Sequence, residues 1–126
     1  MTEVVCAVIL AEGGLLYAFR RPASGDNAGR WEFPGGRVEA GETHEAALHR
    51  ELAEELSLAV TIDRELPDVA DERIRLRPFV CQILPGSAFR LRVHDAVRLD
   101  TPDALNALDW CPLDRLILAD LPRDGG

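Results

Sequence analysis

Apolar residues fall into short runs along this chain, separated by turns rich in glycine and polar residues. One run extends from Val4 to Leu10 and another from Leu15 to Phe19, with the turn signal Glu12-Gly13-Gly14 between them. Two apolar runs on either side of a glycine turn are typical of a β-hairpin. We therefore expect the chain to begin with a hairpin, followed by a loop over 23–30, where glycine, aspartate and asparagine are frequent.

The segment from His44 to Leu56 has a helical repeat instead. Its apolar residues recur at helical spacing, and Thr43 in front of it is a favourable N-cap. These apolar residues are Ala47, Leu48, Leu52 and Leu56. A second helix is expected to start at Thr101-Pro102, because proline is favoured in the first turn of a helix.

Further strands are predicted on both sides of the first helix. A short aromatic strand, Trp31–Gly36, precedes it and is broken by Pro-Gly-Gly. Three apolar segments follow it, at Ala59–Ile62, Arg73–Leu84 and Phe89–Leu99. Pro78 predicts that the second of these strands is broken or lies at a sheet edge, since proline has no amide hydrogen to donate.

Strands before, between and after two helices predict the fold class α+β, with a mixed β-sheet flanked by helices. A chain of 126 residues is long enough for one such domain and too short for two, so 1–126 is expected to be a single domain. No apolar run approaches the roughly 18 to 20 residues of a membrane helix, and the first residues lack the pattern of a signal peptide. We therefore expect a cytoplasmic protein without membrane contact.

The charge balance restricts the class of partner. Fourteen basic and 22 acidic side chains give a formal net charge of −8. Such a surface repels a nucleic-acid backbone, which argues against a polymer substrate. A small phosphate-bearing substrate would be repelled as well, unless divalent cations lie between the two negative partners.

Three carboxylates of the first helix point to that exception. Glu51, Glu54 and Glu55 are spaced i, i+3 and i+4, so they form one stripe beside the leucines. Like charges at this spacing cost roughly 0.2 to 0.5 kcal/mol per pair, and Arg50 alone cannot balance three of them. Hard divalent cations such as Mg²⁺ would neutralise the stripe. The alternative is a solvated helix face in an acidic protein.

The wider pattern favours the metal site. From Gly36 the chain reads Gly-x5-Glu42-x7-Arg50-Glu51-Leu52-x-Glu54-Glu55-x-Ser57-Leu58, which closely resembles the Nudix box. At background frequencies of roughly 5 to 7% per residue, six such identities would coincide about once in 10⁷ to 10⁸ starting points. The preceding Trp31-Glu32-Phe33-Pro34-Gly35 resembles the lead-in of the MutT-like branch. The resemblance implies an α/β/α sandwich, a loop-helix-loop metal site, and hydrolysis of a nucleoside diphosphate linked to another group.

The resemblance also implies roles for individual residues. Arg50 is a catalytic residue that orients the helix, Gly36 and Glu42 support the site, and Arg21 contacts a substrate phosphate. Water would attack a phosphorus in line, and Glu51 or Glu54 would take its proton, with Glu51 favoured by analogy. The implied cofactor is Mg²⁺, with Mn²⁺ as the alternative, and its ligands are the Gly35 carbonyl, Glu51, Glu54 and Glu55.

Two positions depart from the family. Ser57 stands where the box usually has glycine, at a cost of order 1 kcal/mol in a left-handed conformation. Val93 stands where many MutT-like chains carry a further glutamate that binds metal or acts as a base. His94 or Asp95 would have to replace it, or the number of metals or the rate is in doubt.

The base-recognition site is expected around Trp110–Arg115, which resembles a segment of nucleobase-reading relatives. Asp114 would accept a hydrogen bond from an exocyclic amine such as that of cytosine. The alternative is that Asp114 caps the turn over Arg115–Leu118. Phe33 and Phe79 are candidates to pack on the base, although an isolated phenylalanine is more often a core residue.

The leading hypothesis is a Mg²⁺-dependent nucleoside triphosphate pyrophosphohydrolase of the MutT-like or CTP-pyrophosphohydrolase-like kind, which could clear modified nucleotides from the pool. A second hypothesis in the same class is a hydrolase of ADP-ribose, a sugar nucleotide or a dinucleoside polyphosphate. A third is a Nudix domain that senses a nucleotide without turning it over; Val93 is the feature in its favour. The expected partner is a small nucleotide, and the chain is a monomer or a homodimer.

Overall fold

A mixed β-sheet centred on β1 organises the computed structural model, which describes residues 1–122. The strands are β1 (Thr2–Leu10), β2 (Leu16–Arg20), β3 (Trp31–Glu32), β4 (Gly35–Arg37), β5 (Val60–Glu65), β6 (Val69–Ala70), β7 (Ile74–Ile83) and β8 (Ala96–Asp100). The helices are α1 (His44–Leu56), α2 (Pro102–Leu105) and α3 (Pro112–Asp120), with a 3₁₀ turn, η1 (Glu12–Gly14), in the first hairpin.

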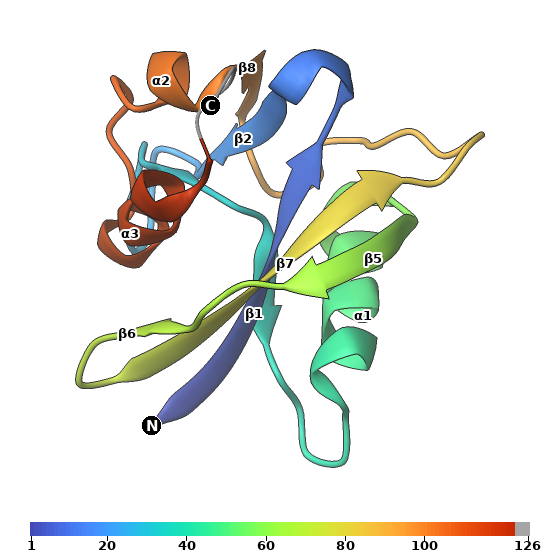
Figure 1. The fold of residues 1–126 in the computed structure, drawn as a ribbon. Coiled ribbons are helices and arrows are strands. Elements are labelled where there is room, and N and C mark those ends of the chain that lie inside the picture. The colour runs from blue at the N-terminus through green and yellow to red at the C-terminus, as the bar shows by residue number, and fades with distance from the viewer. Residues whose placement is uncertain (123–126) are drawn as a thin grey trace.

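The path through the sheet is β3-β2-β1-β7-β5, while β4 pairs with β1, β6 with β7, and β8 with β2. β1 and β7 are parallel over their full overlap, from Thr2 opposite Ile74 to Leu10 opposite Gln82, whereas the other pairs between named strands are antiparallel. Helix α1 covers one face, and α2 and α3 lie on the opposite side (Figure 1). The predicted mixed sheet flanked by helices is confirmed.

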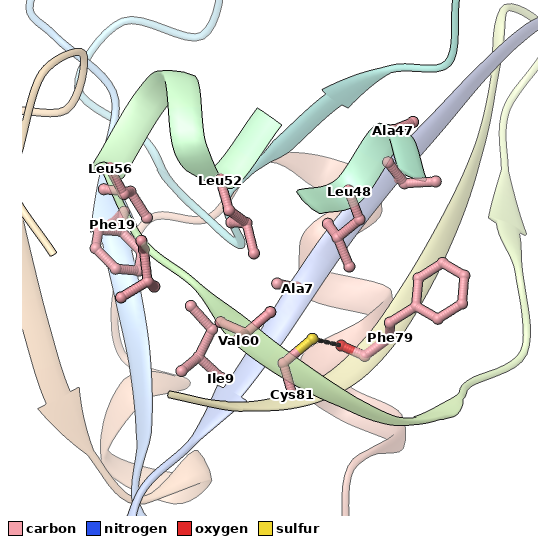
Figure 2. Close-up of a cluster of buried hydrophobic side chains, with 12 residues drawn as sticks. Ala7, Ile9, Phe19, Ala47, Leu48, Leu52, Leu56, Val60, Phe79 and Cys81 are labelled. Carbon is pink, nitrogen blue, oxygen red and sulfur yellow. Dashed lines mark hydrogen bonds between the residues drawn. The ribbon is translucent and has the colours of Figure 1, made fainter. Parts of the chain in front are cut away.

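Strand β1 is buried on both faces, and its side chains alternate between two cores. Val5, Ala7 and Ile9 point toward α1. They pack in one core with Phe79 and the four apolar residues of that helix (Figure 2). Cys6 and Val8 face the other way, toward α2 and α3. The period-2 alternation of a strand explains why this run is continuously apolar: each residue is needed on one face or the other.

Helix α1 has the predicted bounds because its signals are local. The Thr43 hydroxyl accepts a hydrogen bond from the Ala46 amide at 3.1 Å. At the other end Ser57 adopts the left-handed conformation, with φ 53° and ψ 35°, and its amide donates to the Ala53 carbonyl at 3.0 Å. Leu58 then donates to Leu52, which completes the usual C-terminal motif. Serine therefore takes the backbone conformation that glycine usually takes at this position.

The prediction for Pro78 is wrong. β7 is one unbroken strand, and it lies inside the sheet between β1 and the pair β5 and β6. The Pro78 carbonyl accepts from the Leu66 amide at 2.9 Å, so the nitrogen of Pro78 faces the connection between β5 and β6. The missing amide hydrogen thus falls where the ladder is already interrupted, and the parallel pairing with β1 is unaffected.

The predicted strand Phe89–Leu99 is wrong in its first half. Only Ala96–Asp100 forms a strand, β8, which pairs with β2. The residues before it run across the end of α1, where the amides of Arg90 and Arg92 donate to the carbonyls of Leu56 and Glu55. Carbonyls in the last turn of a helix have no partner within the helix. The segment before Ala96 therefore supplies hydrogen bonds to the end of α1 instead of joining the sheet.

Within residues 1–122, no helix is both long and apolar enough to cross a membrane.

Replacing Gly35 by alanine tests the close contact between β4 and β1. A Cβ at Gly35 would overlap the Val5 carbonyl and lie 2.7 Å from the Cα of Cys6, so the two strands would have to separate. We expect Gly35→Ala to lower the free energy of unfolding by at least about 2 kcal/mol. Gly41→Ala is the control: its Cβ would meet nothing within 4 Å, and its φ of +83° costs about 1 kcal/mol. Equal losses in urea denaturation would contradict this account.

Candidate active site

The Arg50 side chain joins the middle of α1 to the loop before the helix. Its Nε and Nη2 donate to the two carboxyl oxygens of Glu42 at 2.7 and 2.9 Å, and Nη2 also donates to the Arg37 carbonyl at 2.9 Å. Its Nη1 donates to Glu51 at 2.9 Å and to Glu54 at 3.3 Å. One guanidinium therefore joins β4, the loop and two of the three carboxylates of the helical stripe.

Arg50 also changes the ionisation of Glu42. The hydrogen bonds from Arg50, together with one from the Glu39 amide at 2.8 Å, lower the pKa of Glu42 to about 2. The same contacts raise the pKa of Arg50 above its ordinary value. Both groups therefore stay ionised over the working range of pH, and the loop is fixed by a charge-assisted, two-point contact. This geometry fits the supporting role that the resemblance implies for Glu42.

Glu51 lies directly against β4. A Cβ at Gly36 would overlap the Glu51 carboxyl group, so glycine is required for the helix and strand to approach this closely. Burial raises the pKa of Glu51, while the hydrogen bond from Arg50 acts in the opposite direction.

Glu55 is the carboxylate that Arg50 does not reach. Burial raises the pKa of Glu55 to about 7, opposed by His94 and reinforced by the negative charges of Glu32 and Glu51. Its Oε1 atom is buried without a hydrogen-bond partner. Glu54, in contrast, has 59% of its side chain exposed. The stripe therefore contains one half-buried carboxylate with a buried, unpaired oxygen (Glu55), one bonded to Arg50 beside β4 (Glu51), and one that is mostly exposed (Glu54).

The three carboxylates do not converge in this arrangement. Among residues 1–122, no group of three or more His, Cys, Asp or Glu side chains is placed so that it could hold a metal ion. Glu51 and Glu54 are both drawn to Nη1 of Arg50. An ion at this stripe would therefore compete with Arg50 for them, and Glu55 Oε1 is the ligand atom without a competing partner.

Residues 93–95, where many MutT-like chains carry a further glutamate, have their side chains in three different environments. Val93 is 44% exposed, and Asp95 forms an exposed ion pair with Arg20 at 2.7 Å. His94 is buried, and its Nε2 lies 2.8 Å from a carboxyl oxygen of Glu32. Of the two proposed substitutes for the family's glutamate, His94 lies beside the site and Asp95 is paired elsewhere.

A cleft of about 490 Å³ adjoins the carboxylate stripe. β4 forms part of its wall through Gly35, Gly36 and Arg37, so the residue that contacts Glu51 also faces the cleft. The volume is sufficient for a small organic ligand. The other lining residues are Val4, Val5, Cys6, Arg21, Asp26, Asn27, Glu32, Phe33, Asp71, Ile74, Leu76, Cys111, Pro112, Leu113 and Asp114.

Asp114 is one of the residues that line this cleft. It is 8% exposed, and its Oδ2 accepts a hydrogen bond from the Phe33 amide at 2.9 Å. Burial, with a contribution from Glu32, raises the pKa of Asp114 to about 7. The capping alternative is wrong: α3 begins at Pro112, so Asp114 lies within the helix, and its side chain bonds a different segment.

Of the two phenylalanines that were candidates to pack on the base, only Phe33 lines the cleft. Phe33 lines the cleft and packs against Trp110 with ring centroids 4.9 Å apart. Phe79 does not line the cleft: it is 1% exposed and belongs to the core cluster that includes the leucines of α1 (Figure 2). Phe79 is therefore unavailable to a base, because its place on β7 turns it to the face opposite the cleft.

Glu32 is a charged lining residue that the sequence did not single out as a functional candidate. It accepts from Arg21 Nη1 at 3.3 Å and contacts His94, and it influences the pKa of both Glu55 and Asp114. Its place within the aromatic lead-in before Gly35 was the available signal. Its partners could not be found in the same way, because they lie far apart in the sequence.

Comparison with known proteins gives consistent matches. The model of the NUDIX domain matches residues 1–125. A Mycobacterium tuberculosis (strain H37Rv) protein, named provisionally as 8-oxo-dGTP diphosphatase 2, is 41% identical over 128 residues, covering 98% of this chain and 90% of the relative. The CTP pyrophosphohydrolase of Escherichia coli (strain K12) is 52% identical over 62 residues, 49% of this chain and 45% of the relative. The solution structure of the E. coli ORF135 protein has a TM-score of 0.75 at 30% identity, covering 94% of this chain and 86% of that one.

The raised pKa of Asp114 predicts a dependence of stability on pH. The folded state holds the proton up to about pH 7, whereas an unfolded aspartate loses it near 3.8. Stability from this group is therefore present below about pH 4 and is lost as the pH rises to about 7. Asp114→Asn cannot ionise and retains an oxygen for the Phe33 amide. We expect the variant to become more stable relative to wild type by about 4 kcal/mol between pH 4 and 8; parallel curves in thermal denaturation would contradict the raised pKa of Asp114.

Proposed function

Because the chain belongs to the Nudix hydrolase family, we propose that it is a divalent-metal-dependent nucleoside triphosphate pyrophosphohydrolase. It would release a nucleoside monophosphate and pyrophosphate. The observation that carries this proposal is that β4 lies between the carboxylate stripe of α1 and the cleft. Gly36 lies against the Glu51 carboxyl group and also lines the cleft that contains Asp114. A base in the cleft would leave its phosphates beside the carboxylates.

The donor atoms suit a divalent cation in their chemistry, and the carboxylates would converge on the ion once it displaced Arg50 from Glu51 and Glu54. Glu55 Oε1 is a buried carboxylate oxygen without a partner, and Glu51, Glu54 and the Gly35 carbonyl supply the further oxygen ligands that Mg²⁺ prefers. Mn²⁺ would suit the same donors. Such an ion would neutralise the stripe and the substrate phosphates, and would lower the pKa of a water molecule.

The chain itself would position the reactants and accept the proton. Arg21 lines the cleft and would bind a phosphate oxygen. A water molecule would attack phosphorus in line and pass its proton to Glu51 or Glu54. Arg50 keeps both carboxylates beside β4 through its Nη1 contacts. Glu42, ionised and bonded to Arg50 at two points, would keep that arrangement fixed during turnover.

The proposed substrate carries a base with an exocyclic amine. Asp114 uses Oδ2 for the Phe33 amide, which leaves its second oxygen for the base. A carboxylate there would accept from the amine of a guanine-type or cytosine-type base. This agrees with relatives whose names specify 8-oxo-dGTP and CTP. The formal charge of −8 supports a free nucleotide in place of a nucleic-acid polymer.

Pyrophosphate release from a panel of ordinary and oxidised nucleoside triphosphates, with ADP-ribose included, tests the proposal. We expect release that depends on Mg²⁺, is abolished by chelator, and is fastest for one guanine-type or cytosine-type triphosphate. Glu54→Gln should lower kcat at least about 100-fold, because it removes a ligand without disturbing the core.

Glu45→Gln is the matched control, since Glu45 is an exposed residue in the first turn of the same helix. It should retain wild-type kinetics. Release that is insensitive to chelator, or equal activity of the two variants, would refute the metal site. Turnover of ADP-ribose alone would contradict the proposed triphosphate substrate and favour the alternative of an ADP-ribose hydrolase.

A further inference from the structure

One buried histidine beside the site has no part in the steps above. His94 is 4% exposed, and its ring lies against Phe19 with centroids 5.4 Å apart. Its Nε2 is 2.8 Å from Glu32 Oε2, and its Nδ1 is buried without a partner. A residue present only to fill this space would not need two ring nitrogens, because burying an unpaired nitrogen costs free energy that an apolar side chain avoids.

The partner of His94 connects it to the cleft. Glu32 is mostly buried, and its carboxylate accepts from Arg21 Nη1 at 3.3 Å as well as contacting His94. Arg21 is further held by its Nε, which donates to the Asp26 carbonyl at 2.8 Å. Glu32 and Arg21 both line the cleft, whereas His94 lies behind them. The three side chains thus form a continuous path from the interior to the place where a phosphate would bind.

We propose that His94 is a positioning residue that holds the Glu32 carboxylate and, through it, directs the Arg21 guanidinium toward the phosphates of the substrate. This inference rests on the proposed function, because it takes Arg21 as a phosphate ligand. Nε2 donates to Glu32 and fixes the rotation of its carboxylate. Without that bond, Glu32 keeps only the longer contact to Arg21, and both side chains can turn away from the cleft.

The neighbouring residues explain why this role falls to His94. Of residues 93–95, only the middle side chain turns inward, while Val93 is exposed and Asp95 pairs with Arg20. Arg21 lines the cleft whereas His94 does not, so any effect of His94 on the substrate would pass through Arg21. The effect of His94 should therefore appear in KM and depend on the presence of Arg21.

The test is a double-mutant cycle between His94 and Arg21, measured by steady-state kinetics with the preferred triphosphate. His94→Leu should raise KM about tenfold, with kcat changed less than about threefold, since a bond to a charged group is lost. His94→Gln can still donate to Glu32 and should restore most of the affinity. In the Arg21→Ala background, His94→Leu should have little further effect on KM. Arg20→Ala is the matched control, because Arg20 is the adjacent arginine but pairs with Asp95.

Three results would overturn the inference: an unchanged KM in His94→Leu, a glutamine variant no better than leucine, or a leucine effect of equal size with and without Arg21. If His94→Leu does not fold, Glu32→Gln replaces it in the cycle, with the same rise in KM expected and an unchanged KM overturning the inference. An inactive wild-type enzyme would remove the proposed function and this inference with it, whereas active wild type with an unchanged KM in the variants overturns the inference alone.

Discussion

The site depends on the sharing of one guanidinium among four carboxylates. Arg50 forms ion pairs with Glu39, Glu42, Glu51 and Glu54, at N to O distances from 2.7 to 3.3 Å. These contacts hold the loop, the strand β4 and the helix α1 in one arrangement. They leave three of the four carboxylates without a full positive partner, so the local charge remains strongly negative. Such a negative site would repel a substrate that carries several phosphates. Bound cations would remove this repulsion, because they neutralise both the carboxylates and the phosphates.

Glu55 makes that requirement specific. It is the carboxylate outside the reach of Arg50, and its buried oxygen has no partner. On the strand side, Gly35 and Gly36 bring β1, β4 and Glu51 into close contact, and side chains at either position would keep them apart. The same two glycines form part of the wall of the cleft that contains Asp114, so the charged stripe and the cleft meet at β4. Under the proposed function, this backbone would lie beside the substrate phosphates.

Sequence alone predicts those features whose signals are local. The bounds of α1 follow from Thr43 and the leucine spacing, and the carboxylate stripe follows from the helical repeat. Errors arise where tertiary contacts override local preference. Pro78 is tolerated in an interior strand because its nitrogen faces an interruption of the ladder, and 89–95 satisfies the end of α1 instead of pairing in the sheet. The contact of Glu32 with His94 joins residues 62 apart, so no local pattern indicates it.

The most direct test of this account is thermal unfolding of wild type and Glu55→Gln, each with Mg²⁺ and with chelator and without nucleotide. The glutamine variant removes the buried charge and keeps its shape. We expect Mg²⁺ to raise the Tm of wild type by about 5 °C or more and to have little effect on the variant, which in chelator should unfold at the same temperature as wild type or higher. A variant that is less stable than wild type in chelator, with Mg²⁺ affecting both proteins equally, would contradict the claim that the Glu55 carboxylate binds a divalent cation.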